Sequence, residues 1–316
     1  MIPLLLLLTV SPACDEPAAR AFDFWVGEWD VLNRWRAESG EWIEAGRATN
    51  QVFHVLDGCA VVELWDGHLG DSHIRGFSVR AWDPATAEWV LVLNWPRPGR
   101  PTFDTLRGGF RHGRGDFHRQ SVNAEGDMVL TRYTFSDITP AALRWNDGTS
   151  LDGGRTWATQ WIMEFTRRDP VTDPPLRNVP LADPGRTRLC PGDTARAFDP
   201  YLGEWTSAEP VARLESMAIV GECAILDQLA WQDSDGLRHE ALFVRALAPD
   251  GGEWVQYALD TIDRRFVRYA GPGPGRLASE GAQTLRWSIT ADGSAMTLMW
   301  DGAPRGGRTF ALERVR

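Results

Sequence analysis

Two stretches of the sequence repeat one another. The segment ARAFDFWVGEW at 19–29 matches ARAFDPYLGEW at 195–205, and eight of the eleven positions are identical. A second block, VRAWDP at 79–84, matches VRALAP at 244–249 in the same order. Matches of this length in a fixed order rarely arise by chance, so the chain is a tandem duplication. The two copies are therefore expected to fold into related units.

The duplication divides the 316 residues into two domains of ordinary size. We predict a first domain over 14–168 and a second, shorter domain over 190–316. The segment between them, 169–189, is rich in proline and has little apolar pattern. Such a composition is typical of an extended, semi-rigid linker.

The chain opens with an apolar run from Ile2 to Val10. This run is much shorter than the roughly 20 residues that span a bilayer, and it is typical of a signal-peptide core. Small residues at Ser11 and Ala13 place the cleavage just before Cys14. We therefore predict that residues 1–13 are a signal peptide and that the protein is exported, to the periplasm or outside the cell. In an alternative interpretation, Cys14 is the acylated cysteine of a lipoprotein.

The four cysteines follow the duplication. Cys14 and Cys190 each precede the Phe-Asp motif of their copy by eight residues, and Cys59 and Cys223 each stand at the start of a later predicted strand. In an oxidising compartment, an even number of cysteines without Cys-x-x-Cys spacing favours disulfides over a zinc site. We predict the bridges Cys14–Cys59 and Cys190–Cys223, one in each domain.

The hydrophobic pattern predicts β-strands. Short runs of strand-forming residues recur in the first copy, each ended by Gly, Asp, Asn or Pro, and no window sustains the 3.6-residue period of a helix. Consecutive short hairpins favour an up-and-down meander, and closure removes its exposed edges. The predicted fold is all-β, with two tandem antiparallel up-and-down β-barrels. The expected strands of the first copy span roughly 24–35, 42–56, 59–67, 72–82, 88–95, 101–111, 115–122, 128–136, 142–149 and 157–167.

Composition and charge exclude several classes of function. All 33 basic residues are Arg, and there is no Lys, which excludes the P-loop, Schiff-base and Ser-x-x-Lys chemistries. The net charge of −10 argues against binding to nucleic acid or to anionic membranes, because both would be repelled on average. We expect no nucleic-acid partner, no transmembrane segment and no cofactor.

One turn has a recognisable pattern. SLDGGRTW at 150–157 fits the Asp-box Ser-x-Asp-x-Gly-x-Thr-Trp of sialidase propellers. A propeller would repeat the box at regular spacing, but here it occurs once. We interpret it as a stable turn in which Asp152 accepts backbone N–H groups, while Gly153 and Gly154 adopt positive φ.

Taken together, these motifs resemble those of a known family. The opening FDFWVGEWDV at 22–31, the segment LDGCAVVELW at 56–65 and the Asp-box turn resemble a family of exported bacterial proteins of unknown function with a lipocalin-like (calycin) barrel. The resemblance covers nearly all of 21–168 and, more loosely, 196–316. It implies a fold and a small-molecule cavity, and it brings no catalytic residue.

The resemblance also assigns a structural role to four residues. Lipocalin-like barrels pack the Trp of the first strand at their closed end, under an Arg from the last strand. Trp29 with Arg167, and Trp205 with Arg314, have similar positions in the two copies. We expect each pair to form a cation–π contact at the base of its barrel.

Glu63 is the most informative carboxylate. It alternates with Val61 and Trp65, so it shares an apolar face, and Asp227 has the same offset from the cysteine of the second copy. An acid inside a barrel must be hydrogen-bonded or paired, or it becomes neutral. Glu63 is expected to orient a ligand or to act as an acid; the alternative is a structural carboxylate paired with an Arg.

Other candidates for ligand contact lie in the predicted strands or near their ends. An Arg on the inner face suits a carboxylate or phosphate, although an outward-facing Arg is the alternative at each position. A Trp near the mouth of a barrel suits a flat or apolar ligand. These candidates are Arg75, Trp95, His118, Arg119, Arg132, Tyr133 and Trp145.

The leading functional hypothesis is a noncatalytic binder of a small apolar or amphipathic molecule. The first barrel would hold the ligand, and the second would be a degenerate copy that serves as a scaffold. The alternative is an isomerase or hydratase acting on an apolar substrate. A buried cluster of Glu63 with an Arg, His or Tyr around an accessible cavity would favour the enzyme, and a filled barrel would exclude it. A third hypothesis, an envelope module without a pocket, requires an exposed aromatic patch.

Overall fold

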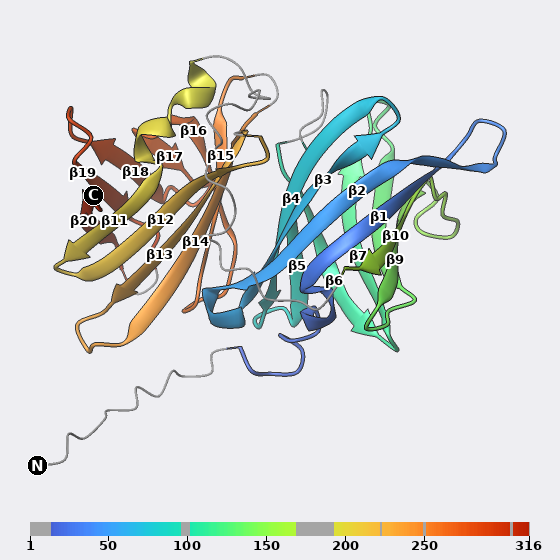
Figure 1. Ribbon diagram of the computed structural model, residues 1–316, viewed down its shortest axis with the longest axis horizontal. Helices are drawn as coiled ribbons and strands as arrows, with labels where there is room; N and C mark the ends of the chain where they lie inside the picture. The colour runs from blue at the N-terminus through green and yellow to red at the C-terminus, as the bar shows by residue number, and fades with distance from the viewer. Residues whose placement is uncertain are drawn as a thin grey trace, which may run out of the picture.

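Two closed antiparallel β-barrels, each of ten strands, stand side by side (Figure 1). They are seen in a computed structural model that describes residues 14–95, 102–168, 193–221, 223–248, 251–303 and 306–315. The architecture confirms the predicted fold class. Each barrel has ten strands, whereas typical lipocalins have eight. The predicted signal peptide (1–13) and linker (169–189) lie outside the described residues.

In the first barrel, every strand pairs with the next along the chain, and β1 pairs with β10 to close the sheet. The 3-10 helices η1 (Asp23–Trp25) and η2 (Leu56–Gly58) precede β1 and β3. Because η1 occupies residues 23–25, the first strand begins three residues later than predicted. The strands are β1 Gly27–Arg36, β2 Trp42–Val55, β3 Ala60–Leu69, β4 Ser72–Asp83, β5 Glu88–Asn94, β6 Asp104–Arg111, β7 Arg114–Val122, β8 Met128–Ser136, β9 Ala142–Ser150 and β10 Trp161–Arg167.

The second barrel repeats this order with strands that are mostly shorter, and β11 pairs with β20 to close it. Two 3-10 helices, η4 (Thr194–Arg196) and η5 (Asp199–Tyr201), precede its first strand. The strands are β11 Gly203–Ala208, β12 Val211–Ile219, β13 Ala224–Gln232, β14 Arg238–Leu247, β15 Trp254–Asp260, β16 Val267–Gly273, β17 Arg276–Ala278, β18 Thr284–Ile289, β19 Ala295–Trp300 and β20 Arg308–Arg314.

Each barrel has one end where an Arg of the last strand lies over a Trp of the first. The guanidinium of Arg167 lies 4.0 Å from the ring centroid of Trp29, and that of Arg314 lies 4.1 Å from the ring centroid of Trp205. Both arginines also donate hydrogen bonds to backbone carbonyl oxygens of the segment that precedes the first strand. The Arg therefore ties this segment to the end of its barrel.

The disulfide Cys14–Cys59 is present, which confirms the first predicted bridge. It joins the segment before η1 to the residue before β3. Because the sulfur of Cys14 is bonded to that of Cys59, it carries no thioether-linked lipid, and the lipoprotein alternative is not supported. The second predicted bridge, Cys190–Cys223, cannot be described in the same way, since Cys190 lies outside the described residues.

The two barrels pack against each other through the outer faces of several strands. In the first barrel, Phe77 and Val79 of β4 face this contact, and in the second, Leu242 and Val244 of β14 belong to the same buried cluster. The hydroxyl of Tyr257 lies 3.2 Å from Thr105 Oγ1 across the contact. Strands buried on both faces have continuous apolar runs, such as VLVL at 90–93.

The Asp-box segment forms the predicted turn between β9 and β10. Asp152 Oδ1 accepts hydrogen bonds from the Thr156 N–H at 2.9 Å and from Ser150 Oγ at 2.8 Å. Gly153 and Gly154 adopt φ values of 73° and 88°, which favour glycine.

No helix among the described residues is long and apolar enough to span a membrane.

Candidate ligand-binding site

The interior of the first barrel contains a cavity. It encloses about 100 Å³, or about 830 Å³ when all unfilled space out to solvent is included. For comparison, an apolar cavity of roughly 150 Å³ binds benzene. The cavity of the first barrel is smaller than this and is continuous with solvent, so a ligand of one ring or more would extend toward the mouth. The lining residues are Trp25, Trp35, Glu63, Arg80, Leu93, Trp95, Asp104, Tyr133, Phe135, Trp145, Asp147, Trp161 and Met163.

Glu63 lies on the inner face of β3 and is only 3% exposed. Its carboxylate accepts three hydrogen bonds: from Asn50 Nδ2 at 3.0 Å, from Ser78 Oγ at 2.7 Å and from Arg80 Nη2 at 2.5 Å. These donors on β2 and β4 stabilise the charged carboxylate, and Arg80 neutralises it. The barrel thus buries an ion pair with no net charge.

The guanidinium of Arg80 is surrounded by aromatic rings. Its central carbon lies 5.1 Å from the ring centroids of Phe22 and Trp25 and 5.6 Å from that of Phe135. Arg80 Nη1 and Nε are buried, and neither has a hydrogen-bond partner among the described residues. Arg80 lines the cavity with donors still to be satisfied.

Indole rings surround the outer part of the cavity. The Trp161 ring lies 5.2 Å from that of Trp145, 5.8 Å from that of Trp95 and 6.3 Å from that of Trp35, measured between centroids. The first two contacts are edge-to-face, and Tyr133 packs in the same way against Trp145. Rings in these orientations offer flat apolar walls to a ligand.

Asp147 lies on β9 directly opposite Tyr133 of β8, and both line the cavity. Asp147 Oδ1 accepts hydrogen bonds from the backbone N–H groups of Gln160 and Trp161, each at 2.9 Å. Burial nevertheless raises the pKa of the Asp147 carboxyl, because desolvation outweighs these hydrogen bonds. Asp147 is therefore an acid that titrates above its ordinary range beside the cavity.

The structure brings four of the sequence-predicted candidates together. Glu63, Trp95, Tyr133 and Trp145 all line the cavity. Arg119 does not line it, but forms an ion pair with Asp104, which does.

The other three candidates lie on the outer face, because strand residues alternate in direction. Ser78 and Arg80 face inward on β4, so Arg75 faces outward, where its Nε contacts Asp66 at 2.6 Å. His118 and Arg132 are partners on β7 and β8. Arg132 lies 4.1 Å from the ring centroid of Trp157, and burial lowers the pKa of His118.

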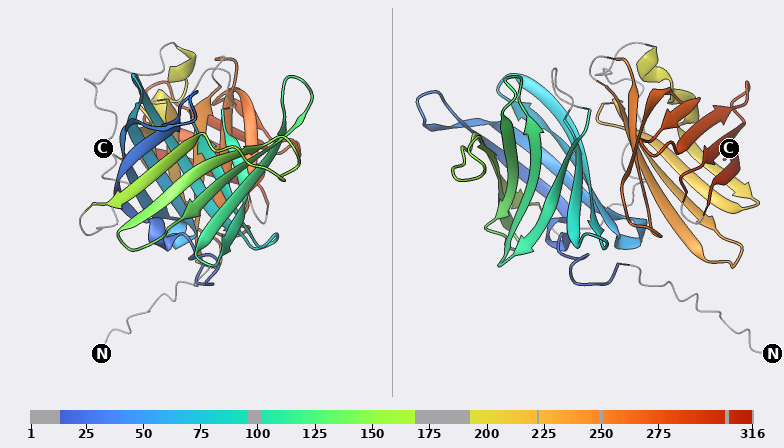
Figure 2. Two further views of the ribbon diagram at one scale, coloured as in Figure 1. Left: turned by 90° about the vertical axis from the view of Figure 1, so that its right-hand side faces the viewer. Right: turned by 180° about the vertical axis from the view of Figure 1, so that it is seen from behind.

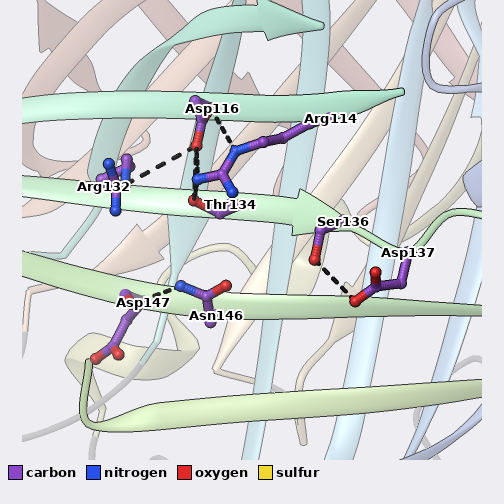
Figure 3. A network of polar contacts seen from close by, with 8 residues as sticks. All are labelled: Arg114, Asp116, Arg132, Thr134, Ser136, Asp137, Asn146 and Asp147. Carbon is purple, nitrogen blue, oxygen red and sulfur yellow. Dashed lines mark hydrogen bonds and ion pairs between the residues drawn. The ribbon is translucent and has the colours of Figure 1, made fainter. Parts of the chain in front are cut away.

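Figure 3 shows the polar network around Arg132 on this outer face. Asp116 accepts hydrogen bonds from Arg114 at 2.8 and 2.9 Å and from Thr134 Oγ1 at 2.7 Å, and Arg132 Nε lies 3.9 Å away. The carboxylate already has these partners, so the network stabilises the β7–β8 pairing. None of the three outer-face candidates lines the interior cavity.

Sequence reasoning missed the most important partner, Arg80. Arg80 and Arg245 occupy the same position in the repeated blocks 79–84 and 244–249, and this shared position was the available signal. Asp147 and Trp161 were also missed. Asp147 belongs to the polar run Asn-Asp-Gly, which is typical of a turn, and only the observed register of β8 and β9 places it on the inner face.

The second barrel contains the equivalent ion pair, Asp227 with Arg245, and both side chains are 0% exposed. Here the guanidinium lies closer to its rings, 4.3 Å from the centroids of both Phe198 and Trp287. Large inward side chains, among them Trp231, pack into one buried cluster in this barrel. The pair that lines a cavity in the first barrel is thus fully buried in the second.

Among the described residues, no group of three or more His, Cys, Asp and Glu side chains is arranged to hold a metal ion.

No protein-family model and no curated protein matches the sequence. Among solved structures, the chain is similar to the S-type phycobiliprotein lyase CPES from Guillardia theta, with 13% identity over 48% of this chain and 92% of that chain and a TM-score of 0.34. It is also similar to EF1p2_mFAP2b bound to DFHBI, with 13% identity over 48% of this chain and 98% of that chain and a TM-score of 0.27. Likenesses at this level identify no family for this chain.

Proposed function

We propose that the first barrel binds a small apolar or amphipathic molecule and that the second barrel is a scaffold. The supporting observation is the contrast between two copies of one ion pair. Arg80 borders a cavity with aromatic walls, whereas Arg245 is fully buried between the rings of Phe198 and Trp287. Aromatic walls with a few buried polar groups are typical of small-molecule sites.

We further propose that the protein acts outside the cytosol. The disulfide Cys14–Cys59 supports this proposal, because such bonds persist in oxidising compartments and are rare in reducing ones.

Binding can be tested with the neutral dye N-phenyl-1-naphthylamine, whose fluorescence rises in apolar surroundings. We expect saturable enhancement with the wild-type protein. Trp95→Ala removes one wall of the cavity and should weaken binding about tenfold, the loss expected for one aromatic contact of about 1.4 kcal/mol. Trp42→Ala is the matched control, because Trp42 is an exposed Trp of the same barrel that does not line the cavity. No enhancement, or equal losses in both variants, would rule out the proposed site.

A second candidate function is an isomerase or hydratase using the same cavity. The buried cluster of Glu63 and Arg80 beside a cavity meets the condition stated for an enzyme, but the oxygens of Glu63 are occupied by three donors. Asp147 is the better acid or base, since it lines the cavity and burial raises its pKa.

The enzymatic alternative predicts proton exchange at carbon. If Asp147 acts as a base, the protein should accelerate loss of the methyl deuterons of trideuterated acetophenone to water, as followed by NMR. Asp147→Asn should abolish this exchange while leaving binding of the dye within about twofold. An exchange rate equal to that of buffer would leave the binder as the only supported function.

A further inference from the structure

Two neighbouring residues that line the cavity, Arg80 and Trp25, have donor groups without partners. Arg80 is 2% exposed and Trp25 is 1% exposed. Arg80 Nη1, Arg80 Nε and Trp25 Nε1 have no hydrogen-bond partner among the described residues. The Arg80 guanidinium lies 5.1 Å from the Trp25 ring centroid, and both residues line the cavity. A buried donor without a partner is costly, so this part of the cavity favours a ligand atom that accepts hydrogen bonds.

The charges near Arg80 favour a neutral hydrogen-bond acceptor over a charged one. The positive charge of Arg80 is already balanced by Glu63 at 2.5 Å. A ligand carboxylate would add a second negative charge beside one cation, in a site of low dielectric constant. Asp147, which also lines the cavity, would add to the repulsion, whereas Asp104 is paired with Arg119. A neutral acceptor meets the free donors without this penalty.

We propose that the cavity of the first barrel recognises a neutral carbonyl oxygen on a flat apolar ligand and discriminates against a carboxylate. This inference rests on the proposed binding function and adds the polarity of the ligand's end near Arg80. Arg80 and Trp25 donate to the carbonyl oxygen, and the indole rings of the mouth contact the apolar remainder. In the second barrel, Arg245 Nε and Nη1 and Trp287 Nε1 also lack hydrogen-bond partners among the described residues. There, however, Arg245 is 0% exposed, and its guanidinium lies closer to its rings, 4.3 Å from the centroids of Phe198 and Trp287.

Three probes of similar shape separate the contributions: acetophenone, isopropylbenzene, which lacks the oxygen, and benzoate, which is charged. Calorimetric titration of the full chain at pH 7.5 should give acetophenone at least about a tenfold lower Kd than either of the others, as one hydrogen bond from a charged donor provides. The carbonyl stretch of bound acetophenone should also shift to lower frequency, which reports the hydrogen bond directly.

Two variants test whether Arg80 and Trp25 cause the preference for acetophenone, and a third is the control. In Glu63→Gln/Arg80→Met, which removes both charges together, the preference for acetophenone over isopropylbenzene should fall to about onefold. Trp25→Phe removes a single donor and should reduce the preference even if the double variant does not fold. Asp227→Asn/Arg245→Met changes the matching pair of the second barrel and should retain the full preference.

The results separate the preference for a carbonyl group from the ability of the cavity to bind a ligand at all. Equal affinity for acetophenone and isopropylbenzene, or tightest binding of benzoate, would overturn the carbonyl preference while dye binding still supported a ligand site. Failure to bind both the dye and all three probes would overturn the binding function as well.

Discussion

At position 63 a carboxylate lies beside a cavity, and at the matching position 227 a carboxylate lies in a packed core. Both are paired with an Arg from the next strand. A buried ion pair of this kind contributes little net stability, but removal of one partner is strongly destabilising, which accounts for its presence in both copies. What differs is the surrounding volume, and the proposed function depends on that difference.

A second buried carboxyl gives a pH-dependent prediction. Asp260 is 4% exposed, and burial raises its pKa to about 6 from 3.8. The folded state therefore binds a proton more tightly than the unfolded state. The stability that Asp260 contributes is fully present below about pH 4 and is lost as the pH rises through about 6.

Asp260→Asn should consequently be more stable than the wild type at pH 8, by about 1–3 kcal/mol, with the difference shrinking at pH 4.5. Urea unfolding at the two pH values measures it. Asp292→Asn is a control of opposite sign, because hydrogen bonds from Thr290 and Ser294 lower the pKa of the exposed Asp292 to about 2. A stabilisation by Asp260→Asn that is the same at both pH values would contradict the assignment.

At the scale of single elements, the sequence predicted the strands well and the direction of individual side chains less well. Glu63 was expected inside the barrel because it shares a face with the apolar Val61 and Trp65, and it lies on the inner face of β3 as expected. The opposite face of this strand is apolar as well, and Phe77 to Ala81 of β4 are all buried, so hydrophobicity alone does not mark which face of β4 is the inner one. Arg75 was therefore chosen as a candidate and Arg80 was not, although only Arg80 faces the cavity.

The disulfide that ties the segment before β1 to Cys59 is expected to stabilise the fold. It closes a loop with a sequence separation of 45 residues. The chain-entropy relation gives a stabilisation of about 4 kcal/mol for such a loop. Cys14→Ala/Cys59→Ala should lower the free energy of unfolding by about this amount, as measured by urea unfolding without reductant. A midpoint equal to that of the wild type would show that the bridge does not stabilise the fold.

Across the whole molecule, the two barrels lie beside each other (Figure 2). They share a buried cluster built from the outer faces of β4 and β14 and their neighbours. The repeat predicted two related barrels but not how they pack. Periodicity indicates which residues are buried and not what covers them, so the apolar outer residues Val79 and Val244 gave no partner in advance. The cavity could not be predicted either, because the positions of inward Trp residues do not fix how much space their rings leave between them.

The central claim is that the first barrel holds a ligand and the second does not. Crystals of the full chain soaked with 4-bromoacetophenone, and measured at the bromine absorption edge, test it most directly. One strong anomalous peak is expected inside the first barrel, with the carbonyl oxygen within hydrogen-bonding distance of Arg80. A peak inside the second barrel, or peaks on outer surfaces alone, would contradict it.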